Sequence, residues 1–88
     1  MEKRLGFVGI VVENRKQSAG KINDALTGHG DIIVGRMGLP HLAHDTSVIT
    51  LIVNATTDEV GTLTGKLGMI DGVSVKSAMS KVSVADKK

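Results

Sequence analysis

Two histidines three positions apart form the clearest metal-ligand pattern in the sequence. His41 and His44 are followed directly by Asp45, and neutral imidazoles with a carboxylate suit a borderline metal such as nickel or zinc. A further ligand would have to come from His29 or from another subunit. The pattern therefore predicts a metal site at His41 and His44, and the alternative is a pair of ordinary histidines on a surface loop.

Arg36 is the second candidate, because it lies in a predicted strand among glycines. Gly35 precedes it and Gly38 follows shortly after, and glycines in a strand leave room for a ligand or another backbone. A guanidinium at such a place can pair bidentately with a carboxylate or a phosphate. We therefore expect Arg36, Gly35 and Gly38 to contact a small ligand. The alternative is a salt bridge from Arg36 to Glu13 or to a neighbouring subunit.

Patterns for several other chemistries are missing. The chain has no cysteine, which excludes disulfides, a thiol nucleophile and cysteine-ligated metal centres. It contains no glycine-rich phosphate-binding motif. The neighbouring acids Asp58 and Glu59 belong to a predicted helix start, where capping explains them, and nothing arranges Ser, His and Asp as a triad. We therefore predict that the protein is not an enzyme, and the sequence identifies no cofactor.

Composition limits the class of protein and its partners. The 88 residues are 41% hydrophobic with a net charge of +2, which predicts one folded domain rather than a disordered chain. Phe7 is the only aromatic residue and much of the basic excess lies near the two ends, so no nucleic-acid partner is expected. No apolar stretch is long enough to span a membrane, and no signal-cleavage pattern follows the first apolar run. We expect a cytoplasmic protein with no membrane partner, one domain over residues 1–82 and a flexible C-terminal tail over residues 83–88.

The alternation of strand and helix patterns predicts the order β-α-β-β-α-β. Asn14 is a plausible N-cap of the first helix, and Gly28 and Gly30 are expected to end it in left-handed conformations. Thr56 and Glu59 have capping-box spacing at the start of the second helix. Residues 40–46 are expected to be a polar loop. The predicted strands cover residues 5–12, 31–39, 47–53 and 73–79.

A weak internal repeat with an offset of 40 positions supports this order. Two βαβ units of this kind form the ferredoxin-like α+β fold, a βαββαβ sandwich with two helices on one face of a four-stranded antiparallel sheet. The alternative is a βαββ meander with a detached second helix. The corresponding pairs are Asn14 and Asn54, Gly28 and Gly68, and Asp31 and Asp71.

The first and third predicted strands are apolar on both sides. Val8 and Ile10 share one side of the first strand, while Phe7 and Val11 share the other. A sheet with one solvated face should instead alternate apolar and polar residues, and a large open apolar patch is unusual for a monomer. We therefore expect a homodimer or a homotetramer. The alternative is that the termini or the 40–46 loop fold back over this face.

Three segments resemble one family of iron-only hydrogenase system regulators. They are IVVENR, GDIIVGRMGLP and LTGKLGMIDGVSVKS, and the resemblance covers about residues 4–81. It implies an ACT-like, ferredoxin-like oligomer in a regulatory role, similar to the nickel-sensing domain of the nickel-responsive repressor. Ligands of ACT-like domains sit at subunit interfaces near strand–helix turns, which adds Asn14 to the expected ligand contacts.

Together these observations predict a small oligomeric regulator that binds a small ligand at a subunit interface and acts on an iron-only hydrogenase system. Two alternatives stay open. The first is a metal-binding sensor that uses His41 and His44. The second is a ligand-free interaction module that docks to a larger protein through a sheet edge.

Overall fold

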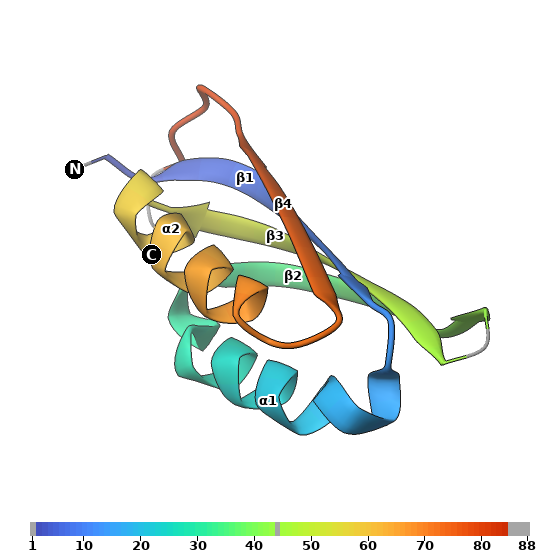
Figure 1. Cartoon of the computed structure of the whole chain (residues 1–88). Helices are drawn as coiled ribbons and strands as arrows, with labels where there is room; N and C mark the ends of the chain where they lie inside the picture. The colour runs from blue at the N-terminus through green and yellow to red at the C-terminus, as the bar shows by residue number, and fades with distance from the viewer. Residues whose placement is uncertain (1, 44, 85–88) are drawn as a thin grey trace.

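The computed structural model describes residues 2–43 and 45–84 of the chain (Figure 1). Neither helix in this part of the chain is long and apolar enough to cross a membrane. The elements are β1 (Arg4–Val12), α1 (Arg15–Gly28), the 3₁₀ helix η1 (Gly30–Ile32), β2 (Ile33–Ala43), β3 (Thr46–Ala55), α2 (Thr57–Gly68) and β4 (Val73–Met79).

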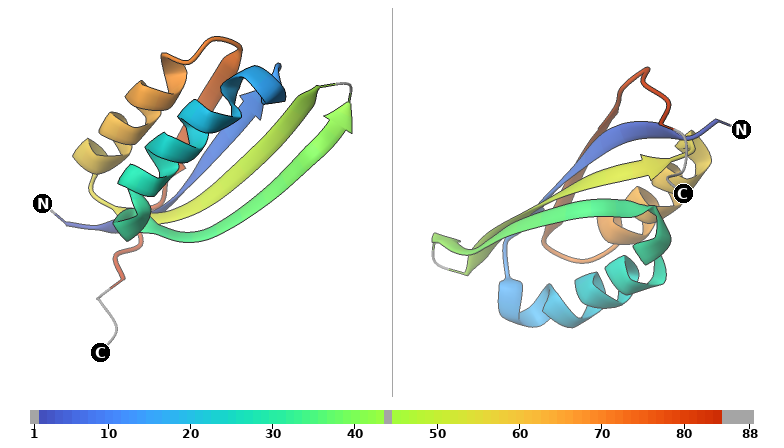
Figure 2. Two further views of the ribbon diagram at one scale, coloured as in Figure 1. Left: turned by 90° about the horizontal axis from the view of Figure 1, so that it is seen from below. Right: turned by 180° about the vertical axis from the view of Figure 1, so that it is seen from behind.

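The four strands form one antiparallel sheet in the order β2-β3-β1-β4. Both helices lie on the same face of this sheet, as the two views of Figure 2 show. This arrangement confirms the predicted ferredoxin-like α+β fold. It excludes the meander with a detached second helix, because Val60, Leu63 and Leu67 of α2 are part of the buried core.

Strand alternation directs one set of side chains toward the helices. In β1 these are Val8, Ile10 and Val12, and each has no exposed surface. Val8 lies opposite Leu51 of β3, so residues of both central strands point into the same core. The remaining core residues are Val53 and Ala55 of β3, Ile22 and Leu26 of α1, Ile32 of η1, and Val60, Leu63 and Leu67 of α2.

The predicted start signals of both helices are present. The side chain of Asn14 accepts a hydrogen bond from the backbone of Gln17, and Thr56 and Glu59 form the capping box. The predicted left-handed ends at Gly28 and Gly30 are wrong. Among the described glycines only Gly72 has a positive φ, of 75°, and a single residue, His29, joins the first helix to the 3₁₀ helix η1.

The expected polar loop over residues 40–46 is also corrected by the structure. Strand β2 continues through Pro40 as far as Ala43, and the pairing of Ala43 with Thr46 makes this end a hairpin. Pro40 is tolerated because β2 is an edge strand, where a missing N–H costs the sheet no outer partner. Pairing is irregular between Leu39 and Ala43.

The chain remains attached to β1 beyond the end of β4. The Ser80 N–H donates to the carbonyl of Leu5 over 2.9 Å, and the Leu5 N–H donates to the carbonyl of Val82 over 3.0 Å. These bonds hold the chain against the sheet up to Val82. Residues 85–88 of the expected tail lie outside the described residues.

Candidate functional site

A hollow of about 250 Å³ opens between α1 and the hairpin of β2 and β3, and we call it the α1–hairpin hollow. Its polar lining consists of Arg15 and Asn23 from α1, Arg36 from β2, and Ser47 from β3. Its apolar lining includes Ala19, Ile22, Pro40 and Ile49. The hollow therefore offers positive charge and hydrogen-bond donors beside an apolar wall.

Strand register directs Arg36 toward the helices. Arg36 lies opposite Leu51, a core residue of β3, and residues opposite each other share one face of a sheet. Its Nη2 donates to Oδ1 of Asn23 over 3.4 Å. This long hydrogen bond joins β2 to α1 across the hollow, and the contact that it makes is with a neutral amide.

Gly38 shares this face, since it lies opposite Ile49. A Cβ added to Gly38 would have its nearest neighbour, the carbonyl oxygen of Val48, at 3.9 Å. The glycine therefore leaves unfilled space next to Arg36, as the sequence pattern suggested for a ligand site.

The other two expected ligand contacts lie elsewhere. A register shift after Ile33 places Gly35 opposite Ile52, on the sheet face that has no helix over it. Asn14 is engaged with Gln17, to which it donates over 3.1 Å, and it does not line the hollow. The structure thus brings Arg36 and Gly38 together and separates them from Gly35 and Asn14.

Sequence reasoning missed Arg15, Asn23 and Ser47. Arg15, Ala19 and Asn23 are spaced four residues apart and share one face of α1, so helical periodicity places them together but does not connect them to Arg36. The backbone N–H of Arg15 also donates to the carbonyl of Asp45 over 3.0 Å. This bond ties the hairpin turn to the start of α1.

The predicted histidine site lies largely outside the part of the chain that the structure describes. His41 lies in β2, but its side chain is not described, and His44 lies outside the described residues. Within residues 2–43 and 45–84, no group of three or more His, Cys, Asp or Glu side chains could hold an ion. The metal site at His41 and His44 therefore stays a prediction.

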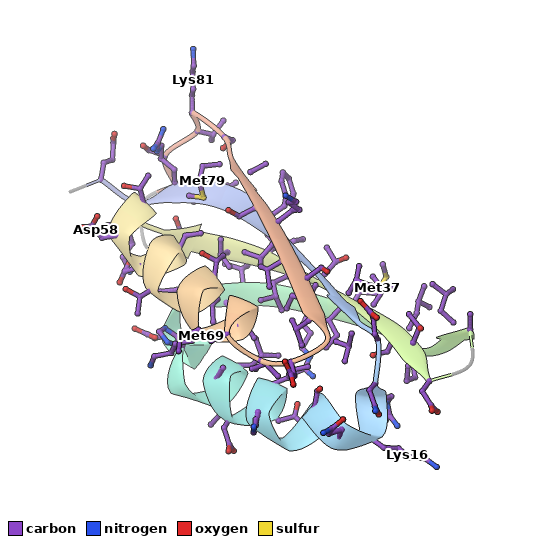
Figure 3. All side chains as sticks on the ribbon, in the orientation of Figure 1. Lys16, Met37, Asp58, Met69, Met79 and Lys81 are labelled. Atoms are coloured by element: carbon purple, nitrogen blue, oxygen red, sulfur yellow. The ribbon has the colours of Figure 1, made fainter. Side chains whose placement is uncertain are left out.

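The sheet face opposite the helices is apolar and exposed. We call it the open face, and we define it by Phe7, Val11, Met37, Leu39 and Ile52, which are 53%, 40%, 66%, 50% and 42% exposed. Met37 points away from α1 in Figure 3. No helix or strand of the described chain lies over this face (Figure 2).

The open face and the α1–hairpin hollow meet along the hairpin. Leu39 belongs to the open face and also lines the hollow. Its pairing partner Val48 lines the hollow as well. Val48 in turn pairs with Val11 of the open face. The hollow and the open face therefore lie on opposite sides of the hairpin and share Leu39 and Val48.

Comparisons with known proteins identify the family. A model described as TM1266-like, iron-only hydrogenase system regulator matches residues 4–77. The solved structure of the uncharacterised protein TM1266 from Thermotoga maritima is 36% identical, covers 91% of this chain and 100% of its own, and has a TM-score of 0.85. A search of curated proteins finds no match.

Two more distant structures show the same fold. The C-terminal domain of the MgtC protein from Mycobacterium tuberculosis is 14% identical over 97% of this chain and 96% of its own, with a TM-score of 0.70. CPII, a nitrogen regulatory PII-like protein from Thiomonas intermedia K12 bound to ADP, AMP and bicarbonate, is 19% identical over 89% and 91%, with a TM-score of 0.52. Fold, family match and sequence identity agree, and the chain belongs to the TM1266-like family of iron-only hydrogenase system regulators.

Proposed function

We propose that the protein is a non-enzymatic regulator that binds a small effector in the α1–hairpin hollow and assembles with copies of itself through the open face. One observation carries this proposal: Leu39 and Val48 line the hollow and also lie where the open face would be covered. Occupancy of the hollow and assembly of the protein would then be linked, because a ligand that favours one arrangement of these residues shifts the assembly equilibrium.

The hollow has the features of a small-molecule site. It is concave, mostly apolar and equipped with a few polar side chains, which is the usual make-up of such sites. Its parts come from α1 and from both strands of the hairpin, so an occupant would bridge two elements that are otherwise joined by few polar contacts. Such a bridge would stabilise the folded state by mass action.

Family membership indicates the process that the protein would regulate. The family description names an iron-only hydrogenase system, and we propose that effector binding adjusts such a system through a partner. CPII shares the fold and is a nitrogen regulatory protein described with bound nucleotides and bicarbonate. This likeness supports a ligand-binding regulator by analogy of fold alone.

A thermal-shift screen with a blocked-hollow variant tests the effector site. Gly38→Leu would place a side chain in the space beside Arg36, where a Cβ has no neighbour closer than 3.9 Å. We expect some small metabolites to raise the melting temperature of the wild-type protein, and this increase to disappear in Gly38→Leu. Gly61→Leu is the control, because Gly61 lies in α2 with nothing within 4 Å and does not line the hollow.

Two outcomes would overturn the effector site. One is a screen in which no compound stabilises the wild-type protein. The other is stabilisation that persists in Gly38→Leu, since the compound would then bind elsewhere. The metal sensor at His41 and His44 and the ligand-free interaction module stay predictions from the sequence; metal uptake that is lost when both histidines are replaced by Ala would favour the sensor.

A further inference from the structure

The lining of the α1–hairpin hollow also indicates what class of effector it takes. We infer that the hollow binds a small organic oxyanion, in which a carboxylate or a phosphate monoester is joined to a short apolar body. This inference rests on the proposed function, because it concerns the same hollow, and it adds the chemistry of the occupant.

The first argument is charge. Arg15 enters the lining from α1 and Arg36 enters it from β2, so two arginines on two different elements border one cavity. None of the lining residues is acidic. Asp45, which lies next to the start of α1, contacts Arg15 through its backbone carbonyl. A hollow with two cations and no lining carboxylate favours an anionic occupant.

The second argument is the geometry of Arg36. Its hydrogen bond to Asn23 is 3.4 Å long and reaches a neutral amide oxygen, which makes it weaker than a bond of about 2.7–2.9 Å from a guanidinium to an anionic oxygen. Exchanging this contact for a carboxylate or phosphate oxygen would gain a stronger interaction. The guanidinium fork also allows two parallel bonds to one oxyanion.

The third argument is the apolar wall and the size of the hollow. Ala19, Ile22, Pro40 and Ile49 also line the hollow, and a polar body against them would lose hydrogen bonds to water. The volume of about 250 Å³ lies below the roughly 300–1,000 Å³ of sites for drug-sized ligands. The body of the occupant is therefore a few carbon atoms long.

Four defined probes test this class of ligand by titration, followed in the amide NMR spectrum of the full chain. They are isovalerate, isopentyl phosphate, the neutral isovaleramide and inorganic phosphate. We expect isovalerate or isopentyl phosphate to shift the amide signals of Asn23, Gly38 and Ser47 in a saturable manner. The neutral amide and inorganic phosphate should each bind at least about tenfold more weakly, which is about 1.4 kcal/mol. The tighter of the two organic anions identifies the head group.

Charge variants separate this inference from a general effect of basic residues. Arg15→Gln and Arg36→Gln should each weaken binding of the anionic probe by about tenfold or more, since each removes a charged hydrogen-bond donor from the hollow. Lys16→Gln removes the same charge from the next residue of α1, which points away from the molecule in Figure 3 and does not line the hollow. This control should bind as the wild-type protein does.

Failure of the inference and failure of the proposed function give different results. If isovaleramide binds as tightly as isovalerate, or if the hits of the metabolite screen that require Gly38 are neutral or cationic, the oxyanion inference is wrong and the effector site stands. If neither the probes nor the screen moves the amides of the hollow, both are wrong. Carboxylate or phosphate hits with another short apolar body would support the inference even if isovalerate fails.

Discussion

The capping box of α2 shows how two side chains fix the start of a helix. The Thr56 N–H donates to Oε1 of Glu59 over 2.9 Å, and the Glu59 N–H donates to Oγ1 of Thr56 over 3.1 Å. The backbone hydrogen bond from Thr56 lowers the pKa of Glu59 below its ordinary 4.5, burial opposes this, and the charge of Lys3 and the Thr56 side chain lower the pKa further. The ionised carboxylate therefore favours the folded state.

The lowered pKa of Glu59 predicts a pH dependence of stability. The unfolded chain takes up the proton near pH 4.5 while the folded chain stays ionised, so this stabilisation is complete above that pH and is lost as the pH falls toward the lower, folded pKa. We expect Glu59→Gln to flatten the fall in unfolding free energy as the pH drops below about 5. Urea unfolding at a series of pH values measures this effect, and Asp58→Gln, at an acid outside the box, serves as the control. If the unfolding free energy of Glu59→Gln fell with pH as steeply as that of the wild-type protein, Glu59 would contribute nothing to the pH dependence of stability.

At the same scale, the sequence revealed only part of the candidate site. Arg36 and Gly38 could be selected because an arginine among strand glycines is unusual. Arg15 and Asn23 could not, because both are ordinary residues of a helix surface and become partners of Arg36 only when α1 packs over β2. The register shift that turns Gly35 to the opposite face is likewise set by pairing between strands, which no local pattern encodes.

At the scale of elements, periodicity and caps were enough to predict the strand and helix order and both helix starts. The hairpin was the main error, since Pro40 and the polar residues after it resemble a loop. The structure extends β2 to Ala43 because an edge strand accepts proline. This extension has a functional consequence, since Pro40 of the extended strand is part of the wall of the hollow.

Two glycine substitutions should change stability in opposite directions. Gly61 lies inside α2 with nothing within 4 Å of an added Cβ, so Gly61→Ala should raise the unfolding free energy by up to about 1 kcal/mol. Gly72 has φ of +75° in the turn before β4, so Gly72→Ala should lower it by about 1 kcal/mol or more. Denaturant unfolding of both variants checks these signs. A stabilising Gly72→Ala would mean that this turn adopts a different conformation.

At the scale of the whole molecule, the open face is apolar and remains uncovered in a single copy of the described chain. Its five apolar side chains come from three strands, and complete burial of each large apolar side chain contributes about 1.5–3 kcal/mol. A two-fold axis between two copies would place their open faces against each other and bury these side chains. The opposite side of the sheet, in contrast, is already buried against both helices in the hydrophobic core.

Two exposed methionines provide a matched test of assembly through the open face. Met37 is 66% exposed on that face, while Met69 is 87% exposed at the end of α2, and Figure 3 shows both. Sedimentation velocity should give the wild-type protein a mass that is a multiple of 9.2 kDa. Met37→Lys should give a monomer, because assembly would bury an unpaired charge, whereas Met69→Lys should assemble as the wild-type protein does.

A wild-type monomer, or an unchanged mass for Met37→Lys, would remove the open face as an interface. Dissociation of Met69→Lys alone would place the contact on the helix side, and the link between hollow and assembly through Leu39 and Val48 would then fail as well.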